Sequence, residues 1–119
     1  MFDIIYYENA QGEKKVKEYI QSLGNKTDKN SRVKASKVAE YIRRLSQFGT
    51  QIGKPTMDKI VGTDLWELRP LRDRIFFAYW KDNTFILLHH FEKKTQKTPK
   101  REIEQAQRYL ADWKERYGE

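Results

Sequence analysis

The stretch "LWELRPLRDRIFFAYWKDNTFILLHHF", residues 65–91, carries the signal that decides the fold. It contains three runs rich in aromatic and large apolar residues, "LWELRPL", "RIFFAYW" and "TFILLHHF", which short polar connections separate. Such runs are typical of β-strands, and short connections join antiparallel neighbours. We therefore predict a meander of three antiparallel strands.

The segment before this meander predicts one strand and two helices. Residues 2–7, "FDIIYY", have the composition of a strand. Apolar residues recur every three or four positions over residues 13–23 and 29–48, as they do on the buried face of a helix. Gly24 and Gly49 follow these patterns and predict where the helices end. The two helices would form an α-hairpin whose apolar face needs a sheet to cover it.

Two further elements complete the expected fold. A short strand is expected near residues 59–61, and residues 99–116 predict a C-terminal helix with Thr98 as its N-cap and Pro99 at the first helical position. This order indicates an α+β fold, in which an N-terminal strand and an α-hairpin pack on one face of a small twisted antiparallel sheet. Residues 1–119 are expected to form a single domain.

Charge and composition narrow the classes of function. The chain has 24 Lys and Arg residues against 17 Asp and Glu, and its net charge of +7 favours a polyanionic partner. The absence of cysteine excludes disulfides and thiolate metal sites. The two histidines are adjacent in a strand and point to opposite faces, so no zinc site is expected. Without a membrane-spanning run or a signal peptide, we expect a soluble cytoplasmic protein.

Alternation along the strands predicts which side chains share a face. Glu67 and Arg69 are expected on the face that points away from the helices. A four-residue turn then places Arg74 opposite Arg69, and a two-residue turn at residues 82–83 pairs Arg74 with Phe91. The open face of the sheet would carry the following side chains together: Glu67, Arg69, Arg74, Phe76, His89, Phe91 and Lys93.

The side chains on this expected face would suit RNA. Arg69 and Arg74 would repel each other, and a bound phosphate would resolve that conflict because guanidinium groups match phosphate oxygens. Phe76 and Phe91 beside them could stack on unpaired bases. The basic residues that follow the last strand would extend the same positive surface.

Plainer readings of these residues remain open. The two arginines could form a surface pair that Glu67 and Asp73 neutralise. A histidine in an apolar strand is more often structural than catalytic. A shift of one residue in the second turn would exchange His89 for His90 on this face. The basic segment 93–101 could be a solvated connection between a strand and a helix.

Four pieces of the chain carry a family resemblance: "WELRP", "RIFF", "ILLHHF" and above all "KKTQKTPKREIE". With them the chain resembles the HigB-type, phage-derived branch of the RelE/ParE toxin superfamily. The resemblance is strong over residues 66–106 and lies in the pattern of elements before that. It implies a RelE-like fold, in which an α-hairpin packs on a small antiparallel sheet, and this agrees with the order of elements read from the residues.

The resemblance implies the toxin of a type II toxin–antitoxin system. Such a toxin is a ribosome-dependent endoribonuclease that cuts messenger RNA by attack of a 2′-hydroxyl on the adjacent phosphate, without a metal or cofactor. The implied partners are the ribosome, messenger RNA and a HigA-like helix-turn-helix antitoxin, through which alone the complex would contact DNA. A ParE-like inhibitor of DNA gyrase on the same fold and an RNA-binding domain without catalysis remain as alternatives.

The resemblance and the expected face together imply roles for individual residues. Arg69, Arg74 and Lys94 are expected to stabilise the phosphate; Arg69 matches the arginine that ends the "ELR" strand, and Lys94 lies where relatives place a basic residue. His89 or Glu67 is the expected general base. The expected RNA-binding residues are Lys93, Lys97, Lys100, Phe76 and Phe91.

The chain also departs from the family pattern. Many relatives carry an aromatic–arginine pair inside the middle strand, where this chain reads "IFFAYW". Arg74 lies a few residues earlier and is the residue expected to supply that charge. Tyr109 and Tyr117 match no catalytic tyrosine of the family.

Overall fold

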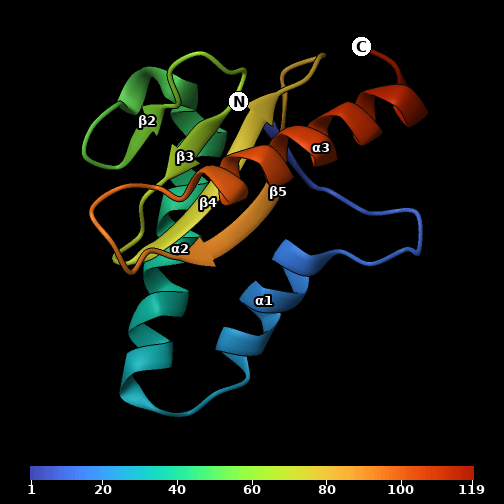
Figure 1. Ribbon diagram of the computed structural model, residues 1–119. Coiled ribbons are helices and arrows are strands. Elements are labelled where there is room, and N and C mark those ends of the chain that lie inside the picture. The colour runs from blue at the N-terminus through green and yellow to red at the C-terminus, as the bar shows by residue number, and fades with distance from the viewer.

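The predicted meander lies in the centre of a five-stranded sheet in the computed structural model, which describes residues 1–119 (Figure 1). Its strands are β3 (Trp66–Leu68), β4 (Asp73–Tyr79) and β5 (Thr84–Glu92). The short strand expected near residues 59–61 is β2 (Met57–Lys59), which pairs with β3. All neighbours among β2, β3, β4 and β5 are antiparallel, which confirms the meander.

The first strand, β1 (Asp3–Tyr6), pairs with β5 in the parallel direction, with Asp3 opposite Thr84 and Tyr6 opposite Leu87. The sheet is therefore mixed, and the prediction of a wholly antiparallel sheet was wrong. A parallel pair requires a long connection between its strands, and here most of the chain lies between the two. Local sequence signals do not specify the direction of such a distant pairing.

The α-hairpin consists of α1 (Lys15–Gly24) and α2 (Lys29–Phe48), close to the predicted bounds. Its apolar residues pack on one face of the sheet, where Val16, Leu23, Val38 and Leu45 belong to the same buried cluster as Phe77. A 3-10 turn, η1 (Gly49–Ile52), follows α2.

Gly49 ends α2, as predicted. It has a φ of +65°, and a Cβ atom there would lie 2.8 Å from the ring of Phe2. Glycine is required at this position because other residues rarely adopt that backbone conformation and because the ring leaves no space.

The last helix, α3 (Lys100–Tyr117), lies across the other face of the sheet (Figure 1). Ala106, Leu110 and Trp113 form a second buried cluster with Phe76 and other residues of the sheet. The prediction that all helices lie on one face, leaving the other open, was wrong. The apolar stripe of α3 needs a surface to cover it, and this face provides that surface.

Two smaller corrections concern residues near and beneath α3. Phe76 is 0% exposed, so it stabilises the core and cannot stack on RNA bases as predicted. The helix starts one residue later than expected, since Pro99 is the N-cap, in an extended conformation, and Thr98 precedes it. None of the helices combines the length and the apolar character that crossing a membrane requires.

The expected strand register is confirmed where the candidate residues lie. Glu67 is opposite Phe76, and Phe76 is opposite His89; Arg74 is opposite Phe91. Asp82 and Asn83 have positive φ values of 53° and 58°, as the central residues of a type I′ turn require. Tyr79 nevertheless lies opposite Phe85, so the predicted two-residue connection, which places Tyr79 opposite Ile86, is wrong by one residue beside the turn.

A β-bulge interrupts this register. Pairing shifts between Phe76 and Phe77, because Phe77 lies opposite Leu87 whereas Phe76 lies opposite His89. Leu88 is therefore the additional residue in β5. Sequence alternation did not indicate this bulge.

Candidate functional site

A hollow of about 590 Å³ lies where the β3–β4 turn meets the connection from β5 to α3. Its lining is Leu71, Arg72, Arg74, Lys93, Lys94, Thr95 and Gln96, and we call it the basic hollow. The two chain segments are tied together by the backbone N–H of Lys93, which donates to the carbonyl of Arg72 at 2.8 Å. The arrangement concentrates positive charge in a concave surface that suits a phosphate group.

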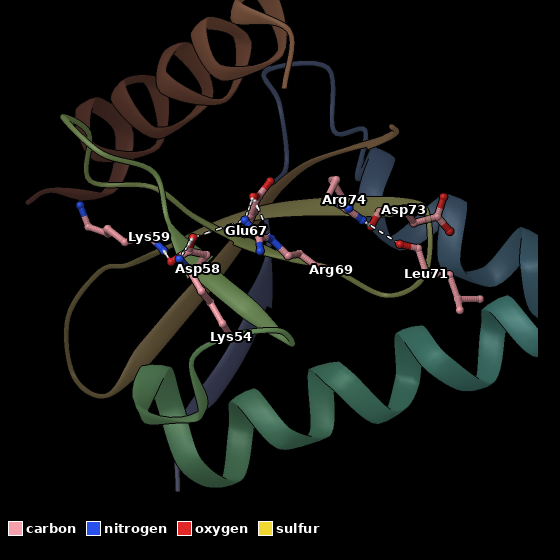
Figure 2. Close-up of polar contacts among 8 residues, drawn as sticks. All are labelled: Lys54, Asp58, Lys59, Glu67, Arg69, Leu71, Asp73 and Arg74. Atoms are coloured by element: carbon pink, nitrogen blue, oxygen red, sulfur yellow. Dashed lines mark hydrogen bonds and ion pairs between the residues drawn. The ribbon is translucent and has the colours of Figure 1, made fainter. Parts of the chain in front are cut away.

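Arg74 is held at the wall of the basic hollow by backbone oxygens. Its Nη1 donates to the carbonyls of Leu71 at 2.8 Å and of Asp73 at 2.9 Å (Figure 2). Its Nε is buried without a hydrogen-bond partner. Burial lowers the pKa of Arg74, but an arginine remains protonated at neutral pH. The guanidinium thus keeps a positive charge that no direct carboxylate contact offsets.

Arg69 has a different environment although it follows β3 directly. Its Nε and Nη2 donate to Oε2 of Glu67 at 3.0 and 2.9 Å, and Nη2 also lies 3.3 Å from Asp58 (Figure 2). Figure 2 shows Arg69 turned toward these carboxylates and Arg74 turned toward the turn at Leu71. The two arginines therefore do not converge on one phosphate. Arg69 is neutralised by two carboxylates, as the plainer reading of the sequence allows. One is Glu67, as expected, and the other is Asp58 rather than Asp73.

Glu67 is 5% exposed, and its carboxylate is tied to Arg69. These contacts weaken its candidacy as a general base, because a base must reach the substrate. They also mean that Arg69 compensates a buried negative charge. Arg69 therefore has a structural role irrespective of any contact with RNA.

We expect Arg69→Ala to lower the free energy of unfolding by about 2 kcal/mol, because it leaves the Glu67 carboxylate buried and uncompensated. The double variant Glu67→Gln/Arg69→Met should recover part of this loss, since it removes both charges. Urea denaturation measures both effects. The matched control is Arg43→Ala on the exposed surface of α2, and an equal loss in this control would contradict the structural role of Arg69.

His89 lies on the α3 side of the sheet and contacts that helix. Its Nε2 is 2.7 Å from Oε1 of Glu102, and its ring lies among those of Phe76, Phe91 and Tyr109. When Nε2 donates to the carboxylate, the neutral imidazole has its free lone pair on Nδ1. The pair can therefore hold a histidine in a fixed orientation with one nitrogen able to accept a proton.

The strand register determines where His89 lies relative to the basic hollow. The ring of Phe91 stacks with that of His89, with centroids 6.1 Å apart, and Phe91 lies opposite Arg74. Arg74 in turn lines the basic hollow. Phe91 thus lies between a proton acceptor and a set of cations on one face of the sheet. A proton acceptor and cations are the two requirements for cleaving a phosphodiester through a neighbouring hydroxyl.

Comparison with known families assigns most of the chain. The model of the family described as "Phage derived protein Gp49-like (DUF891)" matches residues 25–111. The chain belongs to this Gp49-like family. It is a toxin-like family of toxin–antitoxin systems. No curated protein matches the chain.

The Gp49-like match covers all of the basic hollow and the His89–Glu102 pair. It leaves out β1 and α1, together with the connection between them, and the end of α3. The candidate site thus lies in the part of the chain that the family model matches.

Some site residues of this Gp49-like protein were not singled out from its sequence. Arg72 lies in the turn between β3 and β4, and it lines the basic hollow. Glu102 and Tyr109 both contact His89, and they are seven positions apart on α3 with Ala106 between them. Residues with this spacing lie on the same face of a helix, and that was the available signal. It points to His89 only when the face of the sheet that α3 covers is known.

The remaining predicted residues lie around the basic hollow or outside it. Lys93 and Lys94 line it, whereas Lys97 and Lys100 are exposed beside it in the segment that leads into α3. Phe91 is only partly buried, so one aromatic residue of the predicted stacking pair can still reach RNA. No group of three or more His, Cys, Asp or Glu side chains is arranged as a metal site.

His90 lies on the opposite face and packs on the α-hairpin. Its ring stacks on that of Tyr19 with centroids 4.2 Å apart, and Tyr19 donates to the carboxylate of Asp73 at 2.6 Å. Burial lowers the pKa of His90, and the nearby His89 lowers it further, while Asp73 and Glu102 act in the opposite direction. His90 is therefore a neutral, structural residue in the folded Gp49-like chain at neutral pH.

This predicts a pH dependence of stability. The unfolded chain protonates His90 near its ordinary pKa of 6.5, whereas the folded chain resists protonation. The contribution of neutral His90 is thus present above pH 6.5 and is lost as the pH falls below it. Urea denaturation at about pH 7.5 and about pH 5.5 should show a larger acid loss for the wild type than for His90→Phe. Equal losses in the two proteins would contradict this assignment.

Proposed function

We propose that this protein is the RelE-like, HigB-type toxin of a toxin–antitoxin pair, and that it cleaves messenger RNA on the ribosome. The observation that carries the proposal is the basic hollow beside the His89–Glu102 pair. Membership of a toxin-like family supports it. A HigA-like helix-turn-helix protein would be the antitoxin that silences it.

The proposed reaction is an internal transesterification. The ribose 2′-oxygen attacks the adjacent phosphorus while the bond from phosphorus to the 5′-oxygen breaks. His89, oriented by Glu102, would take the proton of the 2′-hydroxyl through Nδ1. The protonated Lys94 would give a proton to the leaving 5′-oxygen. The products would be a 2′,3′-cyclic phosphate and a free 5′-hydroxyl.

The cations of the basic hollow would stabilise the extra negative charge on the phosphoryl oxygens. Arg74 and Lys94 are assigned to this role, and Arg72 and Lys93 line the same hollow. Arg69 was also expected to stabilise the phosphate. It is not assigned to that role, because its guanidinium is paired with Glu67 and Asp58.

Binding of the RNA strand would extend along the segment that leads into α3. Lys97 and Lys100 would contact phosphates on either side of the cleaved bond, and Phe91 would stack on a base. Phe76 has no part in this because α3 covers it.

Induced expression in a bacterial host tests the proposal. The wild type should arrest growth, and mapping of transcript 5′ ends should show cuts that appear only in translated messages. Lys94→Gln should lose both effects, whereas the control Lys37→Gln on α2 should keep them. Growth arrest with intact transcripts and broken DNA would indicate a gyrase inhibitor instead. RNA binding without arrest would indicate a non-catalytic domain.

A further inference from the structure

A second, smaller cavity lies at the edge of the sheet beside His89. β1 ends at Tyr6, opposite Leu87, whereas β5 continues to Glu92, so the end of β5 has no neighbour on that side. The cavity there has a volume of about 120 Å³, and we call it the edge pocket. The rings of Tyr7, Tyr109, His89 and His90 line it.

The rings around the edge pocket are fixed by packing. Tyr7 stacks on Tyr109 with centroids 4.5 Å apart, and Tyr7 donates a hydrogen bond to Asp112 at 2.6 Å. The ring of Tyr109 lies edge-on to that of His89, with centroids 5.9 Å apart. An aromatic lining of this kind suits a planar group such as a nucleobase.

Two charged side chains from the N-terminal segment complete the lining. Oε1 of Glu13 accepts a hydrogen bond from Nδ2 of Asn9 at 2.8 Å, and Oδ1 of Asn9 accepts from the backbone N–H of Glu13 at 2.9 Å. These reciprocal bonds hold the loop and leave the other oxygen of Glu13 available as an acceptor. Lys15 lines the same pocket and contributes a donor.

The size of the edge pocket limits what it can hold. Pockets that enclose a whole small molecule have volumes of roughly 300–1,000 Å³. A cavity of about 120 Å³ is too small for a complete nucleotide and has room for one ring system. The ribose and phosphate of a nucleotide bound there would lie outside, next to His89.

We propose that the edge pocket receives the base of the nucleotide whose 2′-hydroxyl attacks, and that it favours guanine or cytosine. The proposal deepens the nuclease function proposed above and rests on it. His89 lines the edge pocket on one side and stacks on Phe91 on the other, and Phe91 faces Arg74 across the sheet. A base in the pocket therefore places its ribose at His89 and its 3′-phosphate toward the basic hollow.

The preference follows from the polar groups. Glu13 accepts hydrogen bonds and Lys15 donates them, so the best ligand has an exocyclic amine and a carbonyl at the two ends of one edge, where both groups project from the ring. Guanine and cytosine have both, whereas adenine offers a ring nitrogen in place of the carbonyl and uracil offers a ring N–H in place of the amine. Asn9, Glu13 and Lys15 all precede the region matched by the family, so this preference belongs to the N-terminal segment of this chain.

Titration with the four nucleoside 3′-monophosphates, which mimic the product, tests the proposal by NMR without any need for cleavage. Resonances of Tyr109, His89 and His90 should shift with the guanine and cytosine compounds at concentrations about tenfold lower than with adenine and uracil. Inorganic phosphate is the control for the basic hollow and should leave the Tyr109 resonances unchanged. Equal affinity for the four compounds, or the same shifts with phosphate alone, would overturn the proposal.

Variants locate the effect in the edge pocket. Glu13→Gln keeps an acceptor for Asn9, and Lys15→Met keeps the apolar stem, so both preserve the loop while removing a charge. Each variant should bind the guanine and cytosine compounds about as weakly as the adenine and uracil compounds. Lys17→Met removes the same charge from an exposed position of α1 outside the pocket and should bind as the wild type does. Loss of preference in Lys17→Met as well would contradict the assignment.

Mapping of cleavage sites separates this proposal from the nuclease proposal. Cuts should follow guanine or cytosine in the wild type and lose that bias in Lys15→Met. Selective binding by a protein that does not cut RNA would refute the nuclease function and leave the base pocket in place. Cutting without selective binding would refute the pocket and leave the nuclease.

Discussion

Replacing Arg74 and Lys94 together by glutamine is expected to reduce the rate of messenger RNA cleavage by a factor of about 1,000 or more. Both side chains line the basic hollow, and they are assigned to the phosphoryl oxygens, where negative charge increases in the transition state. Glutamine retains hydrogen-bonding capacity and removes the charge. The rate is measured with a translating ribosome programmed with an end-labelled message.

The matched control is the double variant Lys37→Gln/Arg43→Gln on α2, which removes the same charge from outside the basic hollow. It should bind RNA more weakly at low salt, where the long-range attraction that depends on net charge is least screened, and should keep most of the cleavage rate. An equal loss of rate in both double variants would show that the hollow contributes only general positive charge. Each variant should unfold at about the wild-type urea concentration, which separates lost chemistry from lost folding.

Phe76→Ala is expected to cause the largest loss of stability, about 3–5 kcal/mol. The side chain is 0% exposed and lies between the sheet and α3, where its ring contacts Phe91 with centroids 5.2 Å apart. Truncation leaves a cavity that the surrounding helix and strands fill only in part. Urea denaturation followed by far-UV circular dichroism measures the loss, and Phe76→Leu should cost about half as much.

The Phe76 result also distinguishes the observed fold from the one expected at first. On an open sheet face, Phe76→Ala would change stability by less than about 0.5 kcal/mol and would weaken RNA binding instead. Tyr79→Ala is the control, since Tyr79 is an exposed aromatic residue on the same strand. A similar small effect for both substitutions would contradict the packing of α3 on this face.

Local signals predicted the elements well. The three central strands, the α-hairpin and the stop at Gly49 follow from runs, periodicity and glycine placement, all of which act within a few residues. The register between β4 and β5 at His89 was also predicted, although the bulge at Leu88 was not. A bulge depends on packing across the strand rather than on the residue type alone.

The position of the site depended on contacts between distant segments, which sequence patterns do not specify. Phe76 and Glu67 were predicted to lie on an open face of the sheet. Both are buried, and Phe76 belongs to the cluster that this face forms with α3. The register correctly placed Arg69 and Arg74 near each other, but their side chains turn apart. Arg69 turns toward Asp58, which β2 brings to the same place, and no local pattern around Arg69 indicates that contact.

The direct test of the central claim is to identify the ends of the RNA fragments that the purified protein produces on a translating ribosome. We expect 2′,3′-cyclic phosphate and 5′-hydroxyl ends for the wild type, and intact message for Arg74→Gln/Lys94→Gln. Intact message with the wild type, or the same fragments from the double variant, would contradict the claim that the basic hollow cleaves RNA.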